Sequence, residues 1–554
     1  MASSSQSRFI FLGGIPVFDY IITPSLKEIF RAVANDLIMI DDKILLPLGT
    51  IFVCQIEDEK QLLYVNPMAA CEVQKVNEKY YYTMALGGKH TEHTGLSLCL
   101  FDPAAILAEL NQAYPEIIRD ENDLKLVQVE KPTQIQLGGN NRNLIEAIHS
   151  LYDSPELESD SSGIKYEHLF FFDVKTPKFK LIKKFYHDFK VTIGNMVDMH
   201  VDDLLPRESY VITIEDEAAD RRLDRIVLSN CTNEEVIPAE KLAQRYFDLE
   251  YKLRKDKDFI KTNLIINSLT NPEELRLVCR LLNTAYASSV TTFLCPTKTL
   301  FKCFDALVEA RYYTSQKERF FRDREELLYD AVIPFIQYII LNVDELMLFD
   351  RIIRRKGQDA VMRQLVRHMN QGKRGENNRG GRLLLTDGSK GVRYTERLTP
   401  SRALLYWKKA RMPEDTIFKM RYADRQIVCG DDFVDELSST LGAGDTFTGI
   451  FIALKAIAWD SGHALRGATL GSQYFIRTRK RATIKDIVAT DERHIMMGTE
   501  TELRDIISHH LQESGDPTRY GTITDTIITI DTTQVHHPFR EILALAKKIV
   551  AAKK

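Results

Sequence analysis

The sequence predicts an α/β fold: a doubly wound, mostly parallel sheet flanked by helices. From residue 260 onward, strand-like runs at 264–268 and 290–295 alternate with helical segments such as 271–285. This alternation is typical of parallel strands joined by crossover helices. In addition, apolar runs in the segments 8–14 and 134–151 end in glycine turns, which is a common way for such a sheet to present ligand contacts.

The composition is that of a soluble globular protein. The chain has 554 residues, of which 44% are hydrophobic and 27% are charged, with a formal net charge of -4. No overall basic field is available to hold a nucleic acid. The eight cysteines show no CxxC or Cys/His spacing, which favours reduced thiols over zinc or disulfides. The polar start and the lack of a long apolar run predict no membrane partner and a cytoplasmic protein.

The first strand is predicted at 9–12, followed by the Gly13-Gly14 break and then by Asp19. Residues 40–85 alternate apolar and polar repeatedly, which predicts strands outside the α/β rhythm. Two further strands are predicted at 210–214 and 225–228. These strands predict a β-rich lid. The predicted divisions are a core at 1–490, lid or insertion segments at about 35–130 and 195–235, and a C-terminal extension at 491–554 packed on the core.

A strand, a tight Gly138-Gly139 turn and a helix are predicted in the segment 134–151. Asn140 to Asn143 lie at the start of this helix, where their amides either bond sugar hydroxyls or cap the helix. A long charged helical region is predicted at 315–336. The expected remaining elements are a glycine-rich solvated loop at 371–381, helices at 501–512 and 538–553, and a β-prone segment at 524–533.

The segment Leu441 to Gly449, LGAGDTFTG, places a glycine pair and a carboxylate where a loop becomes an apolar helix. Gly442 and Gly444 leave room for backbone close to a ligand, and the N–H groups of a first helical turn attract anions. Asp445 beside such a pocket is suited to accept a proton during phosphoryl transfer. The alternative is that Asp445 only caps the helix.

Five motifs follow one another in a particular order. They are Gly14 with Asp19, GGNNRN at 138–143, LNVDEL at 341–346, LLLTDGSKGV at 383–392 and LGAGDTFTG. This succession resembles the ribokinase-like (PfkB) carbohydrate kinase family, of which the chain would be a large, insertion-bearing member. The resemblance implies a ribokinase-like fold.

The resemblance also implies roles for individual residues. It makes Asp445 the catalytic base. The backbone of the preceding turn would form an anion hole: Gly442, Ala443 and Gly444. The substrate-binding residues implied are Asp19, Gly138, Gly139 and Asn143. The nucleotide-side loop implied is Thr386, Gly388 and Gly391. The residues that organise Mg²⁺ near the phosphates are Asn342 and Glu345, whose oxygens suit a hard cation.

Departures from the family pattern accompany these matches. Ser439 and Leu441 stand where the family often has an aspartate and a threonine, which weakens the inference of a monovalent cation site. The GGxxxN element normally comes earlier in the chain than residue 138. A second doublet, at Gly87 to Lys89, competes for its role, but no apolar helix follows it directly.

The sequence therefore predicts an ATP-dependent phosphotransferase that uses Mg²⁺ and moves the γ-phosphate to a hydroxyl of a sugar or sugar-like small molecule. An ADP-dependent sugar kinase is the nearest alternative, favoured by the chain length and by the run from Val332 to Leu346. A catalytically silent scaffold or regulatory protein on the same fold is the other. The resemblance further implies a homodimer formed through the lid. The sequence does not name the sugar.

Overall fold

The computed structural model describes the greater part of the chain. The described residues are 7–14, 16–24, 26–33, 38–40, 43–56, 59–64, 73–76, 79–85, 94–95, 98–99, 104, 107–108, 111–112, 121–129, 134–152, 164–169, 179–189, 191–193, 207–216, 221–229, 239–255, 261–269, 271–288, 290–309, 313–314, 319–320, 323–353, 357–369, 381–388, 391–397, 422–427, 442–456, 461–478, 480–487, 523–524 and 527–531. The helices expected at 501–512 and 538–553, most of the loop at 371–381, and the residues Ser439, Leu441 and Gly87 to Lys89 lie outside them.

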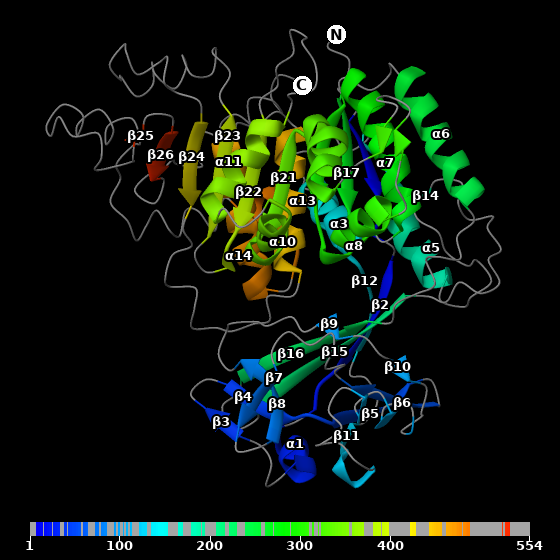
Figure 1. Ribbon diagram of the computed structural model, residues 1–554, viewed down its shortest axis with the longest axis vertical. Helices are drawn as coiled ribbons and strands as arrows, with labels where there is room; N and C mark the ends of the chain where they lie inside the picture. The colour runs from blue at the N-terminus through cyan, green and yellow to red at the C-terminus, as the bar shows by residue number, and fades with distance from the viewer. Residues whose placement is uncertain are drawn as a thin grey trace, which may run out of the picture.

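In the described part of the chain, eleven strands form the main sheet (Figure 1). In spatial order they are β14 (Val191–Ile193), β13 (Ile164–Leu169), β1 (Ser7–Leu12), β17 (Lys261–Asn267), β18 (Thr291–Cys295), β21 (Tyr338–Asn342), β22 (Arg382–Thr386), β23 (Val392–Arg397), β24 (Tyr422–Ile427), β26 (Ile527–Asp531) and β25 (Ile523–Thr524). The strands from β14 to β22 are all parallel, whereas β23 is antiparallel to both of its neighbours. This confirms the predicted mostly parallel α/β sheet.

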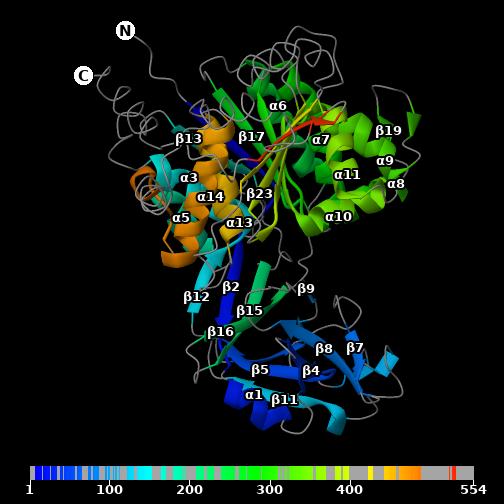
Figure 2. The ribbon, with the colours of Figure 1, turned by 90° about the vertical axis from the view of Figure 1, so that its left-hand side faces the viewer.

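Helices cover both faces of this sheet (Figure 2). One face carries α3 (Asn140–Tyr152), α5 (Phe179–Asp188), α13 (Ala443–Ala456) and α14 (Ser461–Thr478). The other face carries α6 (Ala239–Lys255), α7 (Pro272–Ala287), α8 (Lys298–Glu309), α10 (Val343–Ile352) and α11 (Gln358–His368). Strand β1 contributes to both cores, because Phe9 and Phe11 face the first set of helices and Ile10 and Leu12 the second. The sheet is therefore doubly wound, as predicted.

The β-rich part lies at one end of the molecule, beyond the strand ends from which β1 continues (Figures 1 and 2). Within the described ranges it holds a five-stranded sheet, ordered β12 (Gln134–Gly138), β2 (Val17–Ile22), β15 (Arg207–Asp216), β16 (Arg221–Ser229) and β9 (Thr94–Gly95). A four-stranded sheet has the order β10 (Leu98–Cys99), β6 (Glu59–Tyr64), β5 (Thr50–Ile56) and β11 (Lys125–Val129). Another has the order β3 (Ile38–Ile40), β4 (Lys43–Pro47), β8 (Lys79–Ala85) and β7 (Val73–Val76).

These sheets confirm the strands predicted at 40–85, 210–214 and 225–228. The short helices α1 (Leu26–Val33) and η1 (Glu121–Asp123) belong to the same segments of the chain. Strand β26, from the segment 491–554, continues the main sheet by pairing with β24. The functional division into core and lid stays a prediction.

The prediction of one long helix at 315–336 is wrong. The structure has the short strands β19 (Tyr313–Thr314) and β20 (Arg319–Phe320), then α9 (Arg324–Leu327), a π-helical turn (Leu328–Val332) and a 3₁₀ turn (Ile333–Phe335). Asp323 starts the helix late, since its side chain accepts from the Glu326 N–H at 2.9 Å. At its other end, the helical segment changes to a 3₁₀ turn that contains Pro334 near its start, where the missing N–H of proline costs no hydrogen bond. The high charge of the segment does not show either boundary.

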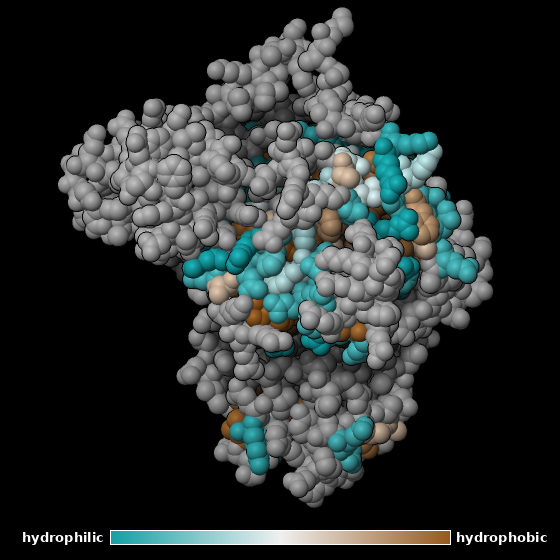
Figure 3. Space-filling view, turned by 45° about the horizontal axis from the view of Figure 1, so that its top comes forward, coloured by the Kyte–Doolittle hydropathy of each residue, from teal (hydrophilic) through white to brown (hydrophobic). Residues whose placement is uncertain are grey.

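Hydrophilic residues predominate over the described surface of the face drawn in Figure 3, with hydrophobic residues between them. The exposed large hydrophobic residues include Phe247 and Tyr251 on α6 and Ile135 on β12. Isolated residues of this kind are normal on a protein surface. Nowhere in the described ranges does a helix combine the length and the apolar character needed to cross a membrane.

Helices α3 and α13 lie in unusually close contact. A Cβ atom added at Gly449 would come within 2.7 Å of the Ala147 Cβ and 3.0 Å of the Leu144 carbonyl oxygen. Further along the pair, the Tyr152 hydroxyl donates to the Ala453 carbonyl at 3.2 Å. Because neither obstacle at Gly449 is the end of a flexible side chain, this contact requires glycine.

We expect Gly449→Ala to destabilise the protein by about 1–3 kcal/mol, because the added methyl group overpacks the contact between α3 and α13. Gly444→Ala is the matched control on the same helix, since a Cβ there would meet nothing within 4 Å; better helix propensity should leave it neutral or stabilise it by up to about 1 kcal/mol. Thermal unfolding of both variants measures the difference. Equal effects of the two substitutions would contradict the close contact.

Candidate active site

The residues singled out in the sequence gather at the carboxyl edge of the main sheet. Gly13 follows the end of β1, and the last residues of the adjacent strands β17 and β18, Asn267 and Cys295, are paired in register. Asn342 and Thr386 are paired in the same way at the ends of β21 and β22. Helix α13 brings Asp445 to this edge. In a parallel α/β sheet, this is the edge at which ligands bind.

Asp445 and Asn143 are in direct contact, although 302 positions separate them. The Asn143 Nδ2 donates to the Asp445 Oδ2 at 2.8 Å, and each residue stands on the first turn of its helix. Gly444 beside Asp445 is exposed. Gly442 has a φ of +80°, and its carbonyl accepts from the Thr446 N–H at 2.9 Å and the Thr446 hydroxyl at 2.6 Å. The structure thus joins the two glycine-led helix starts that the sequence predicted.

Asp19 lies beside the Gly138 backbone. Its strand, β2, pairs antiparallel with β12, so that Asp19 faces Gln136 in register. A Cβ at Gly138 would come within 1.9 Å of the Asp19 Oδ2, so a side chain there would displace the carboxylate. Gly139, with a φ of +99°, then turns the chain into α3. The predicted substrate-binding residues Asp19, Gly138, Gly139 and Asn143 therefore lie in one place.

The electrostatic environment couples Asp19 to the rest of the site. Burial raises the pKa of Asp19 to about 7. The positive charge of Arg142 and a hydrogen bond with Gln136 oppose this rise, while the negative charge of Asp445 adds to it. The two carboxylates act on one another, which places Asp19 and Asp445 at the same site.

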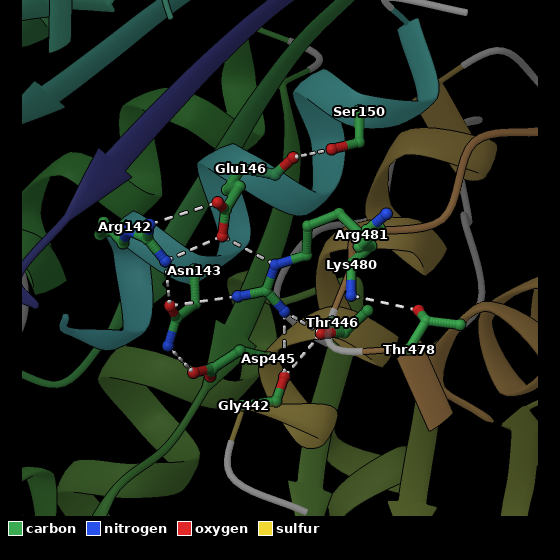
Figure 4. Close-up of polar contacts among 10 residues, drawn as sticks. All are labelled: Arg142, Asn143, Glu146, Ser150, Gly442, Asp445, Thr446, Thr478, Lys480 and Arg481. Atoms are coloured by element: carbon green, nitrogen blue, oxygen red, sulfur yellow. Dashed lines mark hydrogen bonds and ion pairs between the residues drawn. The ribbon is translucent and has the colours of Figure 1, made fainter. Parts of the chain in front are cut away.

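A charged cluster that sequence reasoning missed surrounds Asn143 (Figure 4). Arg142 donates to both oxygens of Glu146, at 2.8 and 3.2 Å, and to the Asn143 Oδ1 at 3.1 Å. Arg481, from the segment that follows α14, donates to Glu146, Asn143, Gly442 and Thr446. Arg142 and Glu146 stand four positions apart on a helix, a detectable signal, but nothing local in the sequence links Arg481 to them.

A buried hydrogen-bonded network holds the turn after β1. The Gly13 carbonyl accepts from the Asn141 Nδ2 at 2.6 Å and from the His168 Nε2 at 2.9 Å. Since a carbonyl only accepts, the His168 proton is on Nε2, and Nδ1 accepts from the Tyr186 hydroxyl. Burial lowers the pKa of His168 to about 4. The imidazole is therefore neutral and structural at physiological pH.

The other asparagines at the start of α3 also bond to protein. The Asn140 Nδ2 donates to the Ser268 hydroxyl at 2.8 Å, and the Asn267 Nδ2 donates to the Asn141 Oδ1 at 3.2 Å. Ser268 has a φ of +50°, a conformation that costs energy for a residue other than glycine. The network holds the end of β17 against α3.

The predicted magnesium residues form a capping box at the start of α10. The Asn342 Oδ1 accepts from the Glu345 N–H at 2.8 Å, and the Glu345 Oε2 accepts from the Asn342 N–H at 2.8 Å. On the neighbouring strand, the Thr386 hydroxyl donates to the Leu341 carbonyl at 3.3 Å. Helix capping thus accounts for these contacts of Asn342 and Glu345, and their role toward a metal stays a prediction.

The glycines of the predicted nucleotide-side loop form a tight turn after β22. Gly388 and Gly391 have positive φ values of 49° and 85°, and the Gly391 N–H donates to the Gly388 carbonyl at 3.1 Å. A Cβ at Gly388 would meet nothing within 4 Å. The turn is open on this side, and its role toward a nucleotide stays a prediction.

Cys295 shows that the two halves of the site share one electrostatic environment. Burial raises the pKa of its thiol, and the negative charges of Glu345 and Asp445 raise it further. Glu345 belongs to the half with the predicted nucleotide loop, whereas Asp445 belongs to the half with Asp19. Over the described residues, no group of three or more histidine, cysteine, aspartate or glutamate side chains is arranged to hold a metal ion.

No family model matches the sequence, and no curated protein matches it either. The solved structures to which the chain is similar include the adenosine kinase of Schistosoma mansoni in complex with 2-fluoroadenosine, at 12% identity and a TM-score of 0.45, covering 84% of this chain and 94% of that one. Another is the Methanocaldococcus jannaschii nucleoside kinase, described as an archaeal member of the ribokinase family, at 12% identity and a TM-score of 0.43, covering 89% and 100%.

A putative ribokinase II of E. coli, in complex with ATP and Mg²⁺, is similar at 14% identity and a TM-score of 0.40, covering 66% of this chain and 92% of that one. At such identities and TM-scores, these likenesses decide neither the family nor the activity of the chain. Its activity has to be argued from its own residues.

The raised pKa of Asp19 predicts a particular dependence of stability on pH. A carboxyl group whose pKa rises on folding, from 3.8 to about 7, stabilises the folded state most below pH 4. This contribution is lost as the pH rises from about 4 to about 7, where the folded protein retains a proton that the unfolded chain has released. The loss is on the order of 2–4 kcal/mol.

Asp19→Asn removes this titration. We therefore expect Asp19→Asn to gain stability over the parent protein progressively between pH 4 and pH 7, and to keep a constant advantage above pH 8. Thermal unfolding at pH 4.5, 5.5, 6.5, 7.5 and 8.5 measures the difference. Asp445→Asn should lower the pKa of Asp19, because the Asp445 charge contributes to its rise. The loss of stability with rising pH should therefore end at a lower pH in this variant than in the parent. A parallel pH profile for Asp19→Asn and the parent would refute the assignment.

Proposed function

We propose that the chain is an ATP-dependent kinase of the ribokinase-like family, which transfers the γ-phosphate to a hydroxyl of a sugar or sugar-like small molecule. The observation that carries this proposal is the hydrogen bond between Asn143 and Asp445. It joins a carboxylate at an open, glycine-led helix start to the helix that follows the Gly138-Gly139 turn. The proposed base, Asp445, and the turn predicted to contact the substrate therefore lie at the same place in the structure.

In the proposed reaction Asp445 is the general base. The acceptor hydroxyl loses its proton to the Asp445 carboxylate as its oxygen attacks the γ-phosphorus, and the bond from that phosphorus to the bridging oxygen breaks, which releases ADP. The N–H groups of the first turn of α13, at Gly442 to Gly444, stabilise the negative charge of the transferring group. Position and electrostatics supply most of the catalysis in reactions of this kind.

Asp19 is the proposed substrate-binding acid. It lies on β2 at the base of the β-rich part, with the Gly138 backbone against it. With a pKa of about 7, its carboxyl group is present in both protonation states near neutral pH, so that it can donate a hydrogen bond to an acceptor oxygen or accept one from a hydroxyl. This chemistry suits a polyol.

The lid is proposed to exclude water from the transfer. Support comes from strand β15, which pairs with β2 so that Ser209 stands beside Asp19, the proposed substrate-binding acid, in register. Exclusion of water prevents wasteful hydrolysis of the nucleotide. We also propose that two copies pair through the lid, since β12 is an edge strand in the described sheet and Ile135 on it is 51% exposed.

Mg²⁺ fits the described residues as a companion of the nucleotide. Mg²⁺ usually keeps several waters and is held by one or two carboxylates together with phosphates. Glu345 is the carboxylate proposed to hold the ion, and its charge, like that of Asp445, acts on Cys295 at the carboxyl edge of the sheet. Asn342 would order Glu345 through their capping box. When bound, the ion would neutralise charge on the phosphates.

Asp445→Asn tests the proposed base. We expect kcat to fall by about 10²–10⁴-fold, the usual contribution of a general base, with the KM for ATP nearly unchanged. Asp359→Asn is the control, since Asp359 also lies on the first turn of a helix, α11, and pairs with Arg393 at 2.7 Å. A coupled assay with a panel of sugars, nucleosides and sugar phosphates measures both. Equal turnover by Asp445→Asn and the parent would refute the role.

The same panel separates the alternatives when ATP and ADP are compared as donors. Turnover with ADP alone would identify an ADP-dependent sugar kinase. A parent protein that neither turns over any acceptor nor shifts its melting temperature with ATP or ADP would instead be a catalytically silent scaffold.

A further inference from the structure

Arg481 lies at the centre of the site, yet the reaction proposed above gives it no task. It follows α14 in the chain, and its side chain is only 8% exposed. The guanidinium group lies 4.2 Å from the centre of the Phe475 ring, which supports one of its faces. Such burial of a charge is costly unless every donor finds a partner.

Each nitrogen of the guanidinium group donates to a partner, and these partners belong to two helix starts. Its Nε donates to the Glu146 Oε2 at 2.8 Å and its Nη2 donates to the Asn143 Oδ1 at 3.2 Å, both on α3. Its Nη1 donates to the Gly442 carbonyl at 3.3 Å and to the Thr446 hydroxyl, at the start of α13. One side chain therefore connects the two helix starts that form the site (Figure 4).

These bonds decide which way the Asn143 amide points. Its oxygen accepts from both Arg142, at 3.1 Å, and Arg481. The amide nitrogen is thereby directed to the Asp445 Oδ2. A reversed amide would place its oxygen against a carboxylate and its N–H group against two guanidinium groups, and both arrangements are repulsive. Arg481 thus acts on Asp445 through Asn143.

We propose that Arg481 is a positioning residue for phosphoryl transfer: it orients Asn143 toward Asp445 and holds the Gly442 carbonyl at the turn that receives the phosphate. This inference rests on the function proposed above. A structural brace between α3 and α13 would use the same bonds, but it would affect stability alone. Two measurements distinguish these roles. Replacing a positioning residue lowers kcat, and the size of that loss depends on whether Asn143 is present.

Arg481→Met, which keeps the length and apolar stem of the side chain, is the main variant. We expect its kcat to fall by about 10²-fold, as small displacements of reacting groups do, with the KM for ATP within about 3-fold of the parent. Arg481→Lys keeps the charge but cannot reach all partners, so its kcat should lie between those of the parent and Arg481→Met. Lys480→Met is the matched control, because Lys480 is exposed and it is the backbone N–H of this residue that donates to the Thr478 hydroxyl.

A double-mutant cycle with Asn143→Ala completes the test. If Arg481 acts through Asn143, Arg481→Met should lower kcat by less than about 3-fold in the Asn143→Ala protein, whereas independent roles would give the full loss again. If the kcat of Arg481→Met lies within about 3-fold of the parent and its melting temperature is lowered, Arg481 only stabilises the contact between α3 and α13. That result would overturn the inference.

The melting temperatures of the same four proteins keep the inference separable from the proposed function. A parent without turnover, combined with non-additive shifts in melting temperature for Arg481→Met and Asn143→Ala, would contradict the kinase proposal but support the bond between these residues. Additive shifts in melting temperature would overturn the inference whatever the parent's activity.

Discussion

The close contact between α3 and α13 is the constraint on which the site depends. The contacts run in step along the two helices: Asn143 with Asp445, Ala147 with Gly449, and Tyr152 with Ala453. The helices are therefore parallel, and their amino-terminal ends come together at the carboxyl edge of the sheet. Two adjacent positive helix ends repel one another, which favours negative groups between them. Asp445 and Glu146 supply such groups, and an incoming phosphate would be a further one.

The positively charged side chains near these helix ends, Arg142 and Arg481, are bound by acceptors on α3. Glu146 is paired with Arg142 and Arg481 together, so both guanidinium groups are held on one side of Asn143. Within this cluster, Asp445 accepts from the amide nitrogen of Asn143. Asn143 therefore links the proposed base to the arginines, because its oxygen accepts from both guanidinium groups while its nitrogen donates to the carboxylate.

The sequence shows those parts of the structure that depend on neighbouring residues. Glycine turns after apolar runs located the ends of β1, β12 and β22, and the alternation of apolar residues located most strands of the β-rich part. The helical spacing after Gly444 located α13. The missed features depend on distant residues: Arg481 is 338 positions from Asn143, and His168 meets the Gly13 turn from another strand. The prediction of one helix over 315–336 failed because the charges of the segment suit a helix throughout, whereas the N-cap Asp323 sets a later start.

Close contacts hold the chain at two points where it passes between the α/β core and the β-rich part. Where β1 leaves the core, a Cβ at Gly13 would come within 2.2 Å of the Asn267 carbonyl oxygen, and Asn141 and His168 hold the Gly13 carbonyl. Where β12 returns, Gly138 pairs with Val17 and packs against Asp19. These contacts fix the position of Asp19 relative to the turns at Gly13 and Gly138. If the predicted lid closes, we expect the bend to lie beyond Asp19, with this carboxylate keeping its place relative to Asp445.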